Sequence, residues 1–266
     1  MKSSYTLTNR RLYVYKLCTI LLSLLGAIFG AVAFANADDT FASNSFLIYN
    51  KYPSTHFIIF IILSAVGTIS APFLFRNAKP TTRATLPTAI SSKFPAIAMI
   101  GIAAWEIINL FNGAKSILGI AAIVCPVVSA VFYATFRHGR LSKASIPSAY
   151  GCLALCIILT IRMYTDMSLE INAPLKLLTQ FSAILMIFSI ITDIRSHTGE
   201  CSLGQYVCSK MLFVTTSITC GACGLIALIA QRGIYPPDYI VYPLLFLFCG
   251  MDALTSLLTC APQSDD

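Results

Sequence analysis

Charged residues are scarce in this chain. Asp, Glu, Lys and Arg together make up 11% of its 266 residues, whereas 57% of the residues are hydrophobic. Soluble domains carry about 25% charged residues, so this composition leaves too little polar surface for a fold that is surrounded by water. Lipid is the alternative solvent, and long apolar runs are then expected to be membrane spans rather than a soluble core.

The sequence also lacks the motifs of common enzyme chemistry. It contains no Walker A loop, no HExxH, no GxSxG elbow and no GxGxxG. The few histidines, His56, His138 and His197, fall in separate segments and cannot form one catalytic triad. We therefore expect no ATP hydrolysis and no cofactor, assign no catalytic residue, and do not expect an enzyme.

Long apolar runs are what the chain does contain. Because these runs are continuous rather than alternating, they exclude lipid-exposed strands and predict an all-α, polytopic integral membrane bundle of about eight helices. The bundle is expected over residues 17–260, between short tails at 1–16 and 261–266 that the topology below makes cytoplasmic. The predicted spans are 17–35, 56–75, 94–111, 116–136, 148–164, 175–192, 211–231 and 240–260.

The basic residues indicate the orientation. With the N-terminus inside, thirteen of the 18 Lys and Arg residues fall in inner segments, which is the positive-inside pattern and puts both termini inside. The formal net charge is +7, and the basic residues that produce it lie between the apolar runs. The sequence contains no nucleic-acid-binding motif. The expected partners are therefore the bilayer and its anionic lipid at the inner face, in the cell membrane, and not nucleic acid.

The first span allows a second interpretation. Residues 35–37, Ala-Asn-Ala, are typical of a signal-peptidase site. The preceding apolar run is about 19 residues long, which exceeds the 7–15 residues of a usual signal core. Whether this span is removed after Ala37 is left open by the sequence.

Two spans contain a carboxylate. Glu106 and Asn109 share one face of span 94–111 because they are three residues apart, and Asp252 lies in the last span. An ionisable residue at membrane depth is costly and often marks a solute or ion pathway, which we predict for these three residues. Counting along the helices puts the two acids about 6 Å apart in depth.

A structural alternative accompanies that hypothesis. Glu106 would then only hold two helices together, and Arg162, near the outer end of its span, is the candidate ion-pair partner. Asp166 is expected to compete for Arg162 because it lies four residues further along the same helix. Lys176, on the other side of that outer loop, is expected to extend toward lipid headgroups.

Two further site hypotheses rest on weaker patterns. Cys249-Gly250-Met251-Asp252 is similar to the GxGD motif of intramembrane aspartyl proteases, with Met251 at the position of the second glycine, and Asp193 is the only candidate second acid on a facing helix. Hydrolysis by two carboxylates requires them to be close, whereas these two are expected at different depths.

Thiols supply the other weak pattern. His197, Cys201 and Cys208 share an inner loop, but their spacing matches no common zinc finger, so no metal is expected. Cys220-x-x-Cys223 lies inside a span and is expected to behave as a pair of small buried residues.

The function that best fits these residues is passage of a small solute, a proton or a cation. The alternative is a non-enzymatic scaffold, sensor or accessory subunit that forms a homo-oligomer or binds a partner membrane protein. Small-residue faces at Gly26/Gly30 and Gly221/Gly224 favour close helix packing and are compatible with either function.

Overall fold

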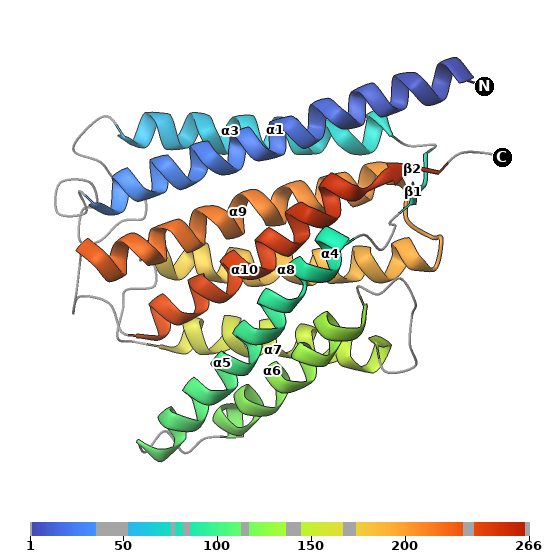
Figure 1. Cartoon of the computed structure of the whole chain (residues 1–266). Helices are drawn as coiled ribbons and strands as arrows, with labels where there is room; N and C mark the ends of the chain where they lie inside the picture. The colour runs from blue at the N-terminus through green and yellow to red at the C-terminus, as the bar shows by residue number, and fades with distance from the viewer. Residues whose placement is uncertain are drawn as a thin grey trace.

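The computed structural model describes residues 2–35, 53–75, 78–81, 86–112, 117–136, 145–166, 174–230 and 237–263. These residues form nine helices and one short antiparallel strand pair, in which Pro80 lies opposite Pro262 (Figure 1). The elements in chain order are α1 (Lys2–Ala35), α3 (Pro53–Leu74), β1 (Pro80–Thr81), α4 (Leu86–Ser91), α5 (Lys93–Phe111), α6 (Ile117–Phe136), α7 (Ser145–Thr165), α8 (Pro174–His197), α9 (Leu203–Ala230), α10 (Asp238–Thr259) and β2 (Ala261–Pro262).

The helices confirm the predicted all-α membrane bundle. Seven segments are long and apolar enough to cross a bilayer, and each overlaps a predicted span; one of them, Pro87–Phe111, runs over both α4 and α5. In α3, at the predicted span 56–75, the described apolar part is Ser64–Leu74. The seven segments are Leu7–Val32, Pro87–Phe111, Ile117–Thr135, Ser145–Thr165, Leu175–His197, Leu203–Ile229 and Asp238–Thr259.

Helix α9 lies at the centre of one half of the bundle, where it packs against α1, α3, α8 and α10. Helices α5, α6 and α7 form the other half, and the two halves meet where α7 packs against α8 and α5 packs against α10 (Figure 1). Both described chain ends lie at the same end of the bundle, together with β1 and β2 (Figure 1). We call this the near end, and the opposite end, where α5 finishes and α10 begins, the far end.

Glycines allow α9 to approach its neighbours closely. A Cβ added at Gly221 would lie 2.5 Å from Leu247 Cβ, and one at Gly224 would lie 2.6 Å from Pro243 Cβ, both on α10. On the other side of α9, a Cβ at Gly30 would lie 2.6 Å from the sulfur of Cys223. The two small-residue faces expected from the sequence therefore lie at α9 interfaces.

Two helices extend beyond the apolar runs from which they were predicted. Helix α1 already begins at Lys2, and Leu12, in the segment expected as a tail, is 2% exposed and belongs to a core cluster with Phe75 and Tyr206. Helix α8 likewise continues to His197. Hydropathy reports where a helix enters lipid, whereas backbone hydrogen bonds and polar contacts continue the helix past that point.

Candidate functional site

Glu106 lies on the buried face of α5. The buried residues of this helix recur every three or four positions, which places them on one stripe toward the bundle, and Glu106 is the only charged member and is 2% exposed. The stripe consists of Pro95, Met99, Ile102, Ala103 and Glu106. The carboxylate is therefore directed at other helices rather than at lipid.

Arg162 of α7 and Tyr242 of α10 meet this carboxylate. Arg162 Nη1 lies 2.6 Å from Glu106 Oε1 and also donates to the Tyr242 hydroxyl at 3.1 Å. The Tyr242 hydroxyl in turn donates to Glu106 Oε1. Both donors use the same oxygen, so Glu106 Oε2 accepts no hydrogen bond from the residues that the structure describes.

Asp238, the first residue of α10, completes the group. Its Oδ2 lies 3.5 Å from Arg162 Nη2, and its Oδ1 accepts hydrogen bonds from Trp105 Nε1 at 2.7 Å and from Asn109 Nδ2 at 3.4 Å. The exposed fractions of the Arg162 and Asp238 side chains are 23% and 30%. We call Trp105, Glu106, Asn109, Arg162, Asp238 and Tyr242 the Glu106 cluster; it lies at the far end, with a partly exposed rim and a buried carboxylate beneath.

The structure corrects two expectations about this end of the molecule. The second carboxylate at Arg162 is Asp238, whereas Asp166 accepts a hydrogen bond from the Tyr239 hydroxyl at 2.8 Å. Lys176 is 0% exposed and does not extend toward headgroups, because its Nζ donates to the backbone oxygen of Asp166 at 2.6 Å. A nearby backbone acceptor lets the ammonium group remain at this depth with its charge solvated.

Asp252 lies deeper in the bundle, in the second half of α10. It is 1% exposed, and its Oδ1 accepts a hydrogen bond from Ser91 Oγ of α4 at 2.9 Å. Cys249, three residues before Asp252 on α10, and Tyr133 of α6 are both buried in the same core cluster. Asp252 therefore belongs to a second buried polar group, which α4 and α10 form together.

The two acids are further apart in depth than the 6 Å expected. Glu106 contacts Tyr242, which is ten residues before Asp252 on the same helix, and this corresponds to about 15 Å along the axis. The expectation was wrong because it started the span at residue 94. The apolar segment begins at Pro87, in α4, which moves Glu106 closer to the far end.

A third buried polar group lies toward the near end, between α8 and α9. Lys210 is 0% exposed, and its Nζ lies 2.7 Å from both Asp193 Oδ2 and Ser189 Oγ. The ammonium group also lies 5.6 Å from the centre of the Tyr206 ring. Asp193 thus bonds to Lys210 while Asp252 bonds to Ser91, so each acid has its own partner and the geometry does not support the two-carboxylate hydrolase.

The structure does not assemble a metal site from His197, Cys201 and Cys208. Over the described parts of the chain, no group of three or more His, Cys, Asp or Glu side chains is placed to hold a metal ion. Burial raises the pKa of the Cys201 thiol and raises that of Cys260 to about 12. Protonated thiols are poor metal ligands, since the thiolate is the form that binds.

Sequence reasoning missed Asp238, Tyr242 and Lys210 as members of these groups. Asp238 follows two prolines at a span boundary, where a carboxylate is also favoured by the start of a helix, so its position alone does not indicate a site.

Comparison with known proteins adds no further assignment: no family model, no curated protein and no solved structure matches this chain.

Proposed function

We propose that this multi-pass membrane protein lets a small solute, a proton or a cation cross the bilayer along the seam between α5 and α10. The Glu106 cluster would receive the solute at the far end, which the charge pattern predicts to be outside. The Asp252–Ser91 group would receive it deeper in the bundle.

One face of α10 supports this route. Its polar residues Asp238, Tyr242, Cys249, Asp252 and Ser256 fall within about 80° of arc at 3.6 residues per turn. This face meets α4, α5 and α7 through the contacts described above, and four of the five residues are buried. A buried polar face of this kind is uncommon in a membrane helix unless it packs or conducts.

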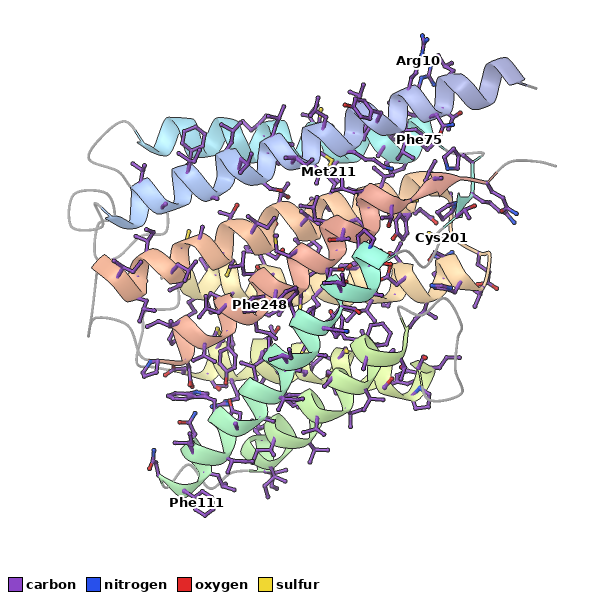
Figure 2. The ribbon with its side chains drawn as sticks, viewed as in Figure 1. Arg10, Phe75, Phe111, Cys201, Met211 and Phe248 are labelled. Atoms are coloured by element: carbon purple, nitrogen blue, oxygen red, sulfur yellow. The ribbon has the colours of Figure 1, made fainter. Side chains whose placement is uncertain are left out.

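The observation that carries the proposal is the open oxygen of Glu106. Although Glu106 as a whole is 2% exposed, its Oε2 is not among the fully buried polar atoms that lack a partner, so this oxygen keeps access to the surface of the site. Here Arg162 and Tyr242 both bind Oε1 and leave Oε2 available to a ligand. Figure 2 shows the side chains between the helices around this region, with Phe111 marking the far end of α5.

An apolar interval separates the two polar groups. Tyr242 and Cys249 are seven residues apart, or about 10 Å along α10. The interval contains Phe246, which is 0% exposed. Phe248 (labelled in Figure 2) stacks on Phe94 of α5 with ring centres 6.3 Å apart, but these two residues are 38% and 53% exposed and lie on the outer side of the seam. Passage therefore requires the Phe246 ring to move or water to enter beside it, and we expect slow, gated flux rather than an open pore.

Flux into reconstituted vesicles tests the proposal. Vesicles that contain the full chain and a pH-sensitive dye are exposed to a pH gradient, and separately to Na⁺, K⁺ and a panel of small neutral solutes. We expect Glu106→Gln to lower the flux that is found by about tenfold or more, equivalent to about 1.4 kcal/mol in the barrier. Asp252→Asn should also lower it.

The matched control is Asp166→Asn, which removes a carboxylate at the same end but outside the seam. Flux should remain near the wild-type value in this variant. No flux for any member of the panel, or a Glu106→Gln variant that conducts like the wild type, would refute passage along this route.

A scaffold, sensor or accessory subunit is the second candidate. The observation in its favour is that the buried acids Glu106, Asp193 and Asp252 each bond to a residue on a different helix, so the same groups can serve to hold the bundle together. Gentle extraction followed by native mass analysis tests this function. A homo-oligomer or a bound membrane protein supports it, whereas monomer alone under conditions that preserve other complexes opposes it.

The proposal places the protein in the cell membrane, with anionic lipid at the near end. Arg10 and Arg11 of α1 and Lys79 beside β1 are exposed there, and Arg10 projects away from the bundle (Figure 2). Basic residues at a membrane surface attract anionic headgroups by about 1 kcal/mol each. Imaging of a fluorescent fusion and lipid retention in native mass spectra test the two parts separately.

A further inference from the structure

We infer that α4 is a lid over the near-end side of the Asp252–Ser91 group, hinged at Ser92 and held closed by the hydrogen bond from Ser91 to Asp252. This inference rests on the proposed function, because it assigns how the inner end of the same route is opened. It joins four observations on α4: its place beside α10, a weak point in the backbone, one exposed face, and a hydroxyl with two acceptors.

Helix α4 occupies the interval between Asp252 and the near end. It follows β1, which lies at the near end, and Ser91, its last residue, donates to Asp252 Oδ1 at 2.9 Å. Figure 1 shows α4 continuing from α5 toward the near end, and α4 packs against α10. Since these two helices run in opposite directions, the next turn of each toward the near end brings Thr88 level with Ser256. Their exposed fractions are 4% and 2%, so α4 covers this turn of α10.

The junction between α4 and α5 is a weak point in the backbone. Pro95 has no N–H, so the Ser91 carbonyl oxygen cannot receive the hydrogen bond that a helix ordinarily supplies four residues later. The next bond, from the Ala96 amide to Ser92 O, is long at 3.4 Å. Ser92 keeps helical dihedral angles, φ −68° and ψ −17°, between the two helices. Rotation at this one residue therefore re-aims α4 while α5 stays in place.

Only one face of α4 is held by the bundle. Thr88 and the adjoining Ser92 are buried on that face, whereas Pro87 is exposed and Ile90 is 49% exposed on the other. The exposed face is apolar, and lipid tails solvate apolar side chains as well as a protein interior does. An outward swing of α4 into lipid therefore carries little hydrophobic cost.

The Ser91 hydroxyl has an acceptor in either position of the lid. Besides Asp252 Oδ1, the backbone oxygen of Thr88 lies 3.1 Å from Ser91 Oγ on the same helix. A hydroxyl has one hydrogen, which is donated to Asp252 in the closed position and to Thr88 O when α4 leaves α10. Opening therefore breaks the hydrogen bond to Asp252 without leaving the serine donor unpaired.

Thiol labelling of the full chain in nanodiscs tests the lid without a flux assay. Ser256→Cys places a thiol on the turn of α10 that α4 covers, and a small water-soluble maleimide modifies it only when the lid is open. Peptide mass spectrometry gives the labelling rate for this variant alone and combined with Ser91→Ala or Ser92→Ala. Ser91→Ala should raise the rate by about fivefold, as the loss of one ordinary hydrogen bond predicts.

The adjacent serine supplies the matched control. The Ser92 hydroxyl donates to Ala89 O of its own helix at 3.2 Å, so Ser92→Ala should leave the rate unchanged. Cys220, which is 0% exposed on α9, serves as an internal control for opening of the whole bundle and should label equally slowly in every variant. If Ser256→Cys does not fold, Thr88→Cys repeats the measurement from the other side of the same contact.

The outcomes separate this inference from the proposed function. Equal labelling in the Ser91→Ala and Ser92→Ala variants refutes the latch. A rise that Cys220 shares refutes local movement of α4. Faster labelling in Ser91→Ala alone, with no measurable flux in vesicles, keeps the lid and refutes passage, whereas flux together with equal labelling keeps passage and refutes the lid.

Discussion

Breaking the buried Lys210–Asp193 pair should destabilise the bundle strongly. The two charged atoms are 2.7 Å apart, and the residues are 0% and 3% exposed. At that distance and an effective dielectric constant of about 20, their attraction is about 6 kcal/mol, of which desolvation offsets a large part. Lys210→Met leaves Asp193 buried without its partner, a loss that typically amounts to about 3–5 kcal/mol.

Thermal unfolding of the purified protein in detergent measures this effect. The loss corresponds to a fall of roughly 10 °C in Tm for a chain of this size. Lys79→Met is the matched control, since Lys79 is exposed at the same end and its removal should change Tm by no more than about 2 °C.

A double variant separates pairing from packing. Lys210→Met combined with Asp193→Leu replaces the ion pair with apolar groups, and such replacements are often neutral or stabilising. The double variant should therefore recover most of the lost stability. If Lys210→Met alone melts with the wild type, or if the double variant is less stable than the single one, the pair is not what holds α8 against α9 here.

Three further predictions concern packing, the near end and pH. Gly250→Ala places a Cβ against the Ser217 hydroxyl of α9 and should lower the free energy of unfolding by about 1–3 kcal/mol. A Cβ at Gly101 would have no atom within 4 Å, so the control Gly101→Ala should leave Tm unchanged or raise it. Equal effects of the two substitutions would refute the close α9–α10 contact. Lys16→Met removes two charged hydrogen bonds of 2.7 and 2.6 Å to backbone oxygens at the end of α10 and should cost about 1–3 kcal/mol per bond at most; an unchanged Tm would show that the bonds do not form in solution. Burial raises the pKa of the Cys260 thiol in the folded protein to about 12. Above about pH 9 the unfolded chain therefore loses this proton before the folded chain does, and the free energy of unfolding should fall by up to about 1.4 kcal/mol per pH unit. Cys260→Ser should flatten the decline in Tm between pH 8 and pH 10, and an identical decline in the variant would refute this role of Cys260.

The positions of the helices could be predicted from the sequence because lipid imposes one dominant constraint. A span needs about 20 apolar residues with its own backbone satisfied, so hydropathy alone locates it. Glu106 and Asp252 stood out for the same reason, since a carboxylate inside such a run is conspicuous. The depth of Glu106 was wrong because α4 adds an inner turn that the prolines and polar residues of that loop concealed.

The partners of these acids could not be predicted, because they depend on how helices that are distant in sequence pack together. Arg162 was a candidate by its proximity to the outer rim, but Asp238 and Tyr242 reach Glu106 only because α10 crosses α5 at that level. Lys210 and Asp193 were assigned to a loop, since hydropathy ends a helix where charges begin. In the structure each neutralises the other and both helices continue.

Contacts at the near end hold α1, α9, α10 and the two short strands together. Lys16 binds α1 to the last turn of α10, and β1 and β2 join the segment after α3 to the segment after α10. Leu203 at the start of α9 is hydrogen-bonded to Ala78 beside β1. In a rigid-body rotation of these helices about the near end, the displacement grows with distance from that end. It is therefore largest at the Glu106 cluster, about 30 Å away along α10.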